Sequence, residues 1–184
     1  LCEYLKDKSN IYKCCVMINP NCPVHILYEF ANSKDSEIRR NIVLNKNCPI
    51  SILNKLIYDK NFQVRYNVIK NSNCTADIFD IYLSENKIYN TRNLNYFTIK
   101  IIAGNDNCTN NILEKIIDII IEYFYSLNSA LDINIFDIIL KSKSCDFKIL
   151  KKIYKFLNVI QMTPGESLMK QILSHPNWRL SDFE

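Results

Sequence analysis

The chain has 184 residues, of which 48% are hydrophobic and 23% are charged, so it can bury a core and is not typical of a disordered protein. Two glycines and five prolines are too few turn residues for an all-β protein. The formal net charge of +4 is well below that of a strongly basic nucleic-acid-binding domain. It comes from residues 1–74, which carry 11 Lys/Arg and 6 Asp/Glu, whereas residues 75–184 carry 12 and 13.

A short corner motif repeats along the chain. The sequence NPNCP at residues 19–23 returns as NKNCP at 45–49 and as NSNCT at 71–75. The cysteine of each motif defines the register, and the sixth corner has tryptophan there: Cys22, Cys48, Cys74, Cys108, Cys145 and Trp178. The spacings are 26, 26, 34, 37 and 33 residues, and a period of this length is typical of helical repeat proteins.

Two helices are expected in each repeat. Apolar residues recur four, five and eight positions after the corner, as in Ile26, Leu27 and Phe30, which places them on one face of a helix that we name helix A. Apolar residues also recur six and five positions before the corner, as in Val16 and Met17, and these predict a second helix, helix B. Each unit is thus helix A, a turn, helix B and an Asn-rich corner.

The residues at the helix ends fit this plan. Asn45 and its equivalents tolerate the left-handed conformation that ends a helix. Pro23 and Pro49 suit the first helical position, where no backbone donor is needed. Asp35 and Asn61 lie at the right distance to cap the start of helix B.

The variation in period has a simple interpretation. Residues 84–95 are polar and predict a loop, and residues 111–126 predict a longer helix A. The apolar stretch 112–127 contains four charged residues, so it predicts a buried helix and no membrane span. Charged residues within the first eight positions argue against a signal peptide.

These patterns predict an all-α fold, an α-solenoid of about five helix-turn-helix repeats, because no single helix here can bury its apolar face alone. We expect one helical-repeat domain spanning residues 1–184. Its units are 1–21 (partial), 22–47, 48–73, 74–107, 108–144, 145–177 and 178–184 (partial).

Residues 19–75 resemble the variant leucine-rich repeat family of bacteria, whose units combine an Asn-Pro-Asn-Thr-Pro corner, a Leu-Leu helix and an Asp-x-x-Val-Arg segment. The matching stretches are NPNCP, HIL, DSEIR, NKNCP, SIL and NFQVR. The resemblance implies a right-handed superhelix of alternating helices, close to HEAT repeats, and a role as an interaction scaffold. Cysteine replaces the corner threonine, so a weaker helix cap is expected. No C-x-x-C spacing is present, so the iron–sulfur module of the family's founding example is not expected.

The eight cysteines are expected to be free thiols without a metal. Neighbouring repeats pack about 8–10 Å apart, which is too far for corner cysteines to form a disulfide or share one zinc ion. A metal held by Cys2, Cys14 and Cys15 is the alternative. Unpaired cysteines favour a reducing compartment, the cytoplasm.

A basic ladder runs along the first helices B. Lys13, Arg39 and Arg65 lie nine positions before their corners, with Arg40 and Tyr66 beside them. These five residues are the candidate binding residues, and the alternative is that the arginines pair internally with acidic groups of the adjacent unit. In later units Ile99, Phe136 and Met169 take the ladder position, which favours an apolar partner surface there over a long nucleic-acid groove.

No catalytic, phosphate-binding or dinucleotide motif is present, and His25 and His175 have no partner at a recognisable motif spacing. We therefore expect no enzymatic activity, no cofactor, no catalytic or metal-binding residues, and no membrane partner. The favoured function is a non-enzymatic scaffold for protein–protein interaction, with an acidic segment as the expected partner. The alternative is a nucleic-acid-binding α-solenoid that uses the N-terminal basic ladder.

Overall fold

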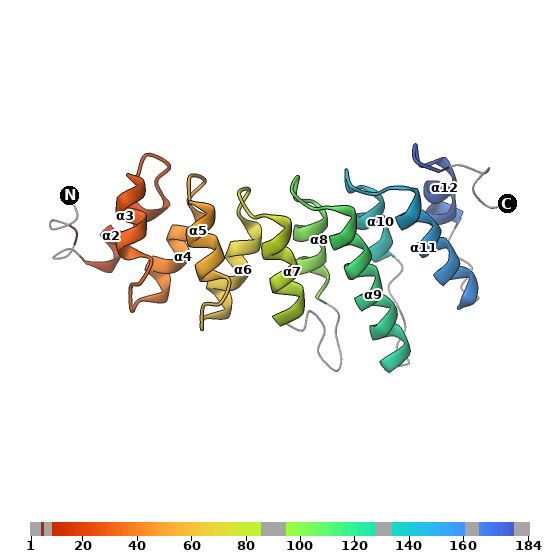
Figure 1. Cartoon of the computed structure of the whole chain (residues 1–184), viewed down its shortest axis with the longest axis horizontal. Coiled ribbons are helices and arrows are strands. Elements are labelled where there is room, and N and C mark those ends of the chain that lie inside the picture. The colour runs from red at the N-terminus through yellow and green to blue at the C-terminus, as the bar shows by residue number, and fades with distance from the viewer. Residues whose placement is uncertain (1–4, 6–8, 86–94, 128–133, 161–165, 179–184) are drawn as a thin grey trace. The chain divides into compact units, whose positions relative to one another are not determined.

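The computed structural model describes residues 5, 9–85, 95–127, 134–160 and 166–178, and within these ranges it is all-helical with no strand (Figure 1). The prediction of an all-α fold is confirmed. The helices are α2 (Asn10–Ile18), α3 (Val24–Phe30), α4 (Ser36–Leu44), α5 (Ile50–Leu56), α6 (Phe62–Lys70), α7 (Ala76–Glu85), α8 (Tyr96–Ala103), α9 (Asn110–Leu127), α10 (Asn134–Leu140), α11 (Phe147–Val159) and α12 (Glu166–Ser174).

The helices alternate as the register predicts. The odd-numbered helices α3 to α11 each follow a corner cysteine and are the predicted helices A, and the even-numbered helices α2 to α12 each precede a corner and are the predicted helices B. The long helix A expected at residues 111–126 is α9, Asn110–Leu127. Most of the loop predicted at 84–95 lies outside the described residues.

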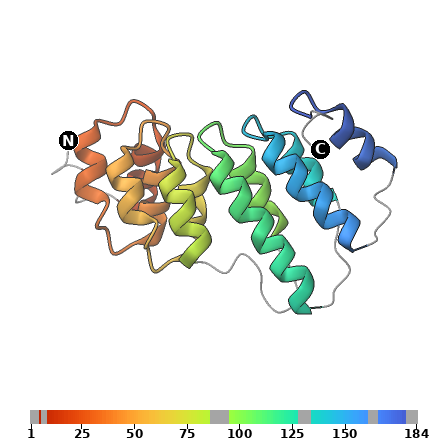
Figure 2. The same ribbon diagram turned by 45° about the vertical axis from the view of Figure 1, so that its right-hand side comes forward.

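The chain divides into two compact units, residues 1–85 and 86–184. In the first unit α4 packs against both α2 and α6, and it also contacts α3 and α5. Figures 1 and 2 show α2, α4 and α6 in one row and α3, α5 and α7 in another. In the second unit α10 packs against α8 and α12, and α11 packs against α9. The single domain spanning residues 1–184 stays a prediction.

The core is made by the positions that carry the apolar repeat. In the first complete unit Ile26 and Leu27 of α3 and Ile42 and Val43 of α4 are fully buried. Their equivalents in the other helices A are buried as well: Ile52, Leu53, Ile78, Phe79, Ile112, Leu113, Ile149 and Leu150. Burial of these apolar side chains on facing helices is the main stabilising term of the fold.

The starts of the helices B are capped as expected. The side chain of Asp35 accepts a hydrogen bond from the Glu37 amide at 2.8 Å, and Asn61 accepts one from the Gln63 amide at 2.8 Å. Pro23 and Pro49 differ slightly from their predicted position, because each lies just before the first helical residue. Proline still fits there, since that position also needs no intrahelical backbone donor.

The corner asparagines correct one prediction. Asn45 ends α4 with φ −67° and ψ 127°, which is extended backbone and not the left-handed conformation. Its Oδ1 accepts a hydrogen bond from the Asn47 amide at 2.9 Å. Its Nδ2 donates to the Met17 and Asn19 carbonyls of the preceding corner, both at 2.7 Å. The asparagine is thus needed for its side-chain amide, whose nitrogen donates and whose oxygen accepts, and not for a special backbone angle.

The same contacts link the next corner. Asn71 Nδ2 donates to the Val43 carbonyl at 2.7 Å and to the Asn45 carbonyl at 2.9 Å, and Asn71 Oδ1 accepts from the Asn73 amide at 2.8 Å. Both Asn45 and Asn71 are buried. We call this series of contacts the corner amide ladder. It satisfies carbonyls at the end of one helix B with a donor from the next repeat.

The last described corner shows that histidine can replace asparagine in the ladder. His175 Nδ1 accepts a hydrogen bond from the Asn177 amide at 3.2 Å, and His175 Nε2 lies 3.2 Å from the Leu140 carbonyl. Because Nδ1 is an acceptor, the hydrogen of a neutral imidazole is assigned to Nε2, which can then donate to Leu140. His175 is therefore a structural residue of the corner.

The cysteines are free thiols wherever the structure describes them, and those at the five corners are buried. Burial raises the pKa of Cys48, Cys74, Cys108 and Cys145 to about 12, so these thiols are protonated at neutral pH and are poor nucleophiles. The corner cysteine is in effect a small apolar residue.

A difference in alkylation follows. Because Cys15 on α2 is exposed, iodoacetamide at pH 8 is expected to modify Cys15 in the native protein well before Cys48 or Cys74. The corner thiols should react only after unfolding in urea. Peptide mass spectrometry of a labelling time course measures both rates, and native labelling of Cys48 as fast as that of Cys15 would contradict the packing described here.

Candidate interaction surface

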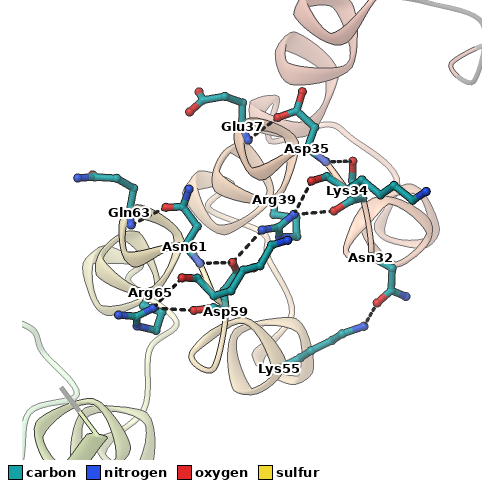
Figure 3. Close-up of polar contacts among 12 residues, drawn as sticks. Asn32, Lys34, Asp35, Glu37, Arg39, Lys55, Asp59, Asn61, Gln63 and Arg65 are labelled. Carbon is teal, nitrogen blue, oxygen red and sulfur yellow. Dashed lines mark hydrogen bonds and ion pairs between the residues drawn. The ribbon is translucent and has the colours of Figure 1, made fainter.

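The central arginine of the basic ladder lies inside the fold. Arg39 Nε and Nη2 donate to the two carboxylate oxygens of Asp59 at 2.5 and 2.8 Å, and Nη1 donates to the Ser33 carbonyl at 2.6 Å (Figure 3). The Arg39 and Asp59 side chains are only 7% and 4% exposed. Such a two-point ion pair is strong and directional. Arg39 is therefore not available on the surface where it was expected to bind, and its geometry favours the alternative of internal pairing.

The pKa shifts of Asp59 and Arg39 agree with this geometry. Burial alone would raise the pKa of the Asp59 carboxyl, but hydrogen bonds from Arg39 and from the Asn61 amide, together with the charges of Arg39 and Arg65, lower it below its ordinary value. The hydrogen bond to Asp59 raises the pKa of Arg39. Both groups are thus charged at neutral pH, and each neutralises the other.

The next ladder residue makes equivalent contacts. Arg65 Nη1 donates to the carbonyls of Asp59 and Lys60 at 2.7 and 3.3 Å, and these positions correspond to Ser33 and Lys34, which Arg39 contacts one repeat earlier. Each arginine thus donates hydrogen bonds to the turn that precedes its own helix B and holds this turn in place (Figure 3). Arg65 and Lys13 are half-buried.

The ladder position points inward in the second unit too. Ile99 of α8 and Phe136 of α10 are fully buried. They belong to the core, so the apolar partner surface that these residues were expected to form is not present at Ile99 and Phe136. Met169 has a side chain outside the described residues.

The exposed face of the helices B lies at a neighbouring register. We name as the B-helix face the residues 12, 8 and 4 positions before each corner, which fall on one side of a helix. In the first unit every one of them is exposed or half-buried: Asn10, Cys14 and Ile18; Ser36, Arg40 and Leu44; Phe62, Tyr66 and Lys70. Since α4 packs against α2 and α6, these positions form a continuous surface of the first unit.

An aromatic and cationic column follows α6 on this face. The rings of Phe62 and Tyr66 stack with centroids 5.9 Å apart. Lys70 Nζ lies 5.8 Å from the centre of the Tyr66 ring, and the Arg65 guanidinium carbon lies 5.8 Å from that of Phe62. Aromatic rings held in this way offer contact area at little cost in conformational entropy.

Arg40 occupies the position on α4 that Tyr66 occupies on α6. Its Nη2 pairs with Glu37 at 2.6 Å, and its side chain is 39% exposed, so it is available to a partner. The polar neighbours Asn41 and Asn67 differ, because their side-chain amides donate to backbone carbonyls of their own helices at 2.7 and 2.8 Å. Of the five predicted binding residues, the structure thus brings Arg40 and Tyr66 together on one face.

Sequence reasoning missed Phe62, Lys70 and the cations at equivalent positions of the second unit, Lys100, Lys141 and Lys170, which are all exposed. The missed signal is in the register: positions eight and four before the corner keep basic residues after the ladder position has become apolar.

The described part of the chain shows no sign of a metal site or of a membrane-spanning helix. There, no three His, Cys, Asp or Glu side chains are grouped so that they could hold a metal ion, and Cys2, the predicted alternative ligand beside Cys14 and Cys15, lies outside it. None of the described helices combines the length and the apolar character that crossing a membrane requires.

Comparison of the chain with protein-family models, with curated proteins and with solved structures gives no match. The resemblance to the variant leucine-rich repeat family therefore stays a prediction. In the residues that it describes, the structure is all-helical with alternating helices A and B, and in the first unit the helices B present an exposed face.

Proposed function

We propose that the protein is a non-enzymatic scaffold, a right-handed α-solenoid of the variant leucine-rich repeat or HEAT-like kind, which binds a protein partner on the B-helix face. Repeats that join end to end through the corner amide ladder suit such an array. The reduced, buried corner cysteines suit a cytoplasmic protein.

One observation supports this function best: the stacked pair Phe62 and Tyr66 lies on the same face as the cations Arg40 and Lys70. Tyrosine and arginine are the residue types that most often dominate binding energy in protein interfaces. Phe62, with 45% of its surface exposed, is a large apolar side chain with room for a partner to cover it.

The charges favour an acidic, aromatic-rich protein segment over nucleic acid. The two ladder arginines donate to groups of their own fold, which removes them from a phosphate-binding stripe. An acidic peptide can still pair with Arg40 and Lys70 while its apolar side chains cover Phe62.

The test is binding of a fluorescent peptide that contains six glutamates and two phenylalanines. The double variant Arg40→Gln, Lys70→Gln is expected to weaken binding about tenfold in low salt, because each lost charge pair removes part of the favourable electrostatic energy. The matched control is Lys46→Gln, Lys60→Gln, which makes the same charge change at two exposed positions away from the face.

The control variant should bind the peptide as tightly as the wild type. Equal weakening of both variants would show that net charge alone drives binding, and it would contradict the proposal. A 20-base-pair duplex that binds more tightly than the peptide, and loses affinity in the Arg40→Gln, Lys70→Gln variant, would favour the nucleic-acid alternative.

A further inference from the structure

The second unit contains a cavity between two of its helices B, α8 and α10. Its volume is about 450 Å³. Tyr96, Lys100 and Gly104 line it from α8 and its C-terminus, and Asp137, Ile138 and Lys141 line it from α10 and its C-terminus. Its size lies within the range of about 300–1,000 Å³ that is usual for ligand sites.

Gly104 lines the cavity at a position of the B-helix face where other repeats have a longer side chain. Four residues before the corner, the first unit has Leu44 and Lys70, and α10 is followed by Lys141. At the end of α8 this position is Gly104, where a Cβ atom would lie only 2.9 Å from the Lys100 carbonyl oxygen.

The groups around the cavity carry charge of both signs. Lys100 and Lys141 are exposed, and within the described ranges neither forms an ion pair. Asp137 is half-buried, and Ala103 and Ile138 supply an apolar wall. Two ammonium groups and one carboxylate leave the site with a net positive charge.

We propose that this cavity binds a short acidic peptide segment that carries an apolar side chain beside its carboxylates. The two lysines would pair with the carboxylates, and the wall formed by Ala103 and Ile138 would cover the apolar group. This site is separate from the first-unit face of the proposed function and does not depend on it.

A peptide fits these groups better than a phosphate compound does. The cavity runs along α8 from Tyr96 to Gly104 and along the second half of α10, and Asp137 adds a carboxylate to the lining. This carboxylate repels a doubly charged phosphate, which has no donor to offer it. A peptide brings N–H donors as well as carboxylates, so it can satisfy acceptors and cations in the same site.

The experiment is a titration of the ¹⁵N-labelled full chain, followed by amide NMR shifts, with a peptide of four glutamates around two leucines that is blocked at both ends. The expected shifts are concentrated in α8 and α10. Lys100→Gln and Lys141→Gln should each weaken binding about fivefold, whereas Asp137→Asn should strengthen it about twofold, since it removes a repelling charge.

Three controls decide the outcome. Lys155→Gln, an exposed lysine of α11, should leave the affinity unchanged, and so should the first-unit variant Arg40→Gln, Lys70→Gln. Inorganic phosphate should not reproduce the shifts. The absence of shifts in α8 and α10 at about 1 mM peptide, equal weakening by Lys155→Gln, or displacement of the peptide by phosphate would each overturn the proposal.

Discussion

Replacing Arg39 by alanine is expected to lower the free energy of unfolding by about 3–5 kcal/mol, the usual cost of removing one partner of a buried ion pair. Asp59, which is 4% exposed, would lose the guanidinium that is hydrogen-bonded to its carboxylate. The Ser33 and Lys34 carbonyls would lose their donor as well. Urea unfolding followed by circular dichroism at 222 nm measures the change.

The neighbouring arginine provides the control. Arg40→Ala removes a half-exposed side chain whose ion pair with Glu37 spans one turn of the same helix, so its cost should stay below about 1 kcal/mol. If Arg39→Ala and Arg40→Ala lowered the free energy of unfolding by the same small amount, Arg39 would not stabilise the fold through a buried ion pair.

The ion pair also has a pH signature. The pKa of Asp59 is lower in the folded state than its ordinary value, so its contribution to stability is complete above the unfolded-state pKa of about 4. It is lost as the pH falls through the lower folded-state pKa. The stability difference between wild type and Asp59→Asn should therefore be constant from pH 7 to pH 5 and should shrink below pH 4.

Replacing Asn71 by alanine is expected to cost about 3 kcal/mol, because each buried polar group left without a partner costs about 1–3 kcal/mol. The substitution removes the donor to Val43 and Asn45 and the acceptor for the Asn73 amide. Asn71→Asp should be at least as damaging, since it keeps the acceptor but turns a carboxylate toward two carbonyl oxygens.

Asn54→Ala is the matched control for the corner amide ladder. Asn54 is an exposed residue in α5, where alanine has the higher helix propensity, so the variant should be as stable as the wild type or more stable by up to about 0.5 kcal/mol. Urea unfolding of the three variants tests the ladder, which would be refuted if Asn71→Ala behaved like Asn54→Ala.

The helices and their alternation could be predicted because burial imposes a period on the chain. Apolar residues return at the positions of Ile26 and Leu27 after each of the other corner cysteines, and this regularity needs no knowledge of distant contacts. The caps at Asp35 and Asn61 are local for the same reason. The role of Asn45 was harder to predict from the sequence, because its side chain donates to carbonyls 26 and 28 residues away.

The binding face was harder to predict because adjacent helical residues point about 100° apart. Arg39 and Arg40 are neighbours in sequence, yet one is buried and the other half-exposed. The aspartate that pairs with Arg39 lies 20 residues further along, in a turn that no motif marks. The cavity beside Gly104 could not be predicted either, since its volume depends on the spacing of two helices. A glycine where equivalent positions have long side chains was the available signal.

The most direct test compares the urea midpoints of two double variants that remove the same charge. Arg39→Gln, Arg65→Gln changes the inward ladder position, and Arg40→Gln, Lys70→Gln changes the exposed B-helix face. We expect the first midpoint to fall by about 1 M or more, given typical urea slopes of 1–3 kcal/mol/M, and the second to stay near that of the wild type. If the first variant kept the urea midpoint of the wild type and the midpoint of the second variant fell strongly, the assignment of inner and outer faces would be contradicted.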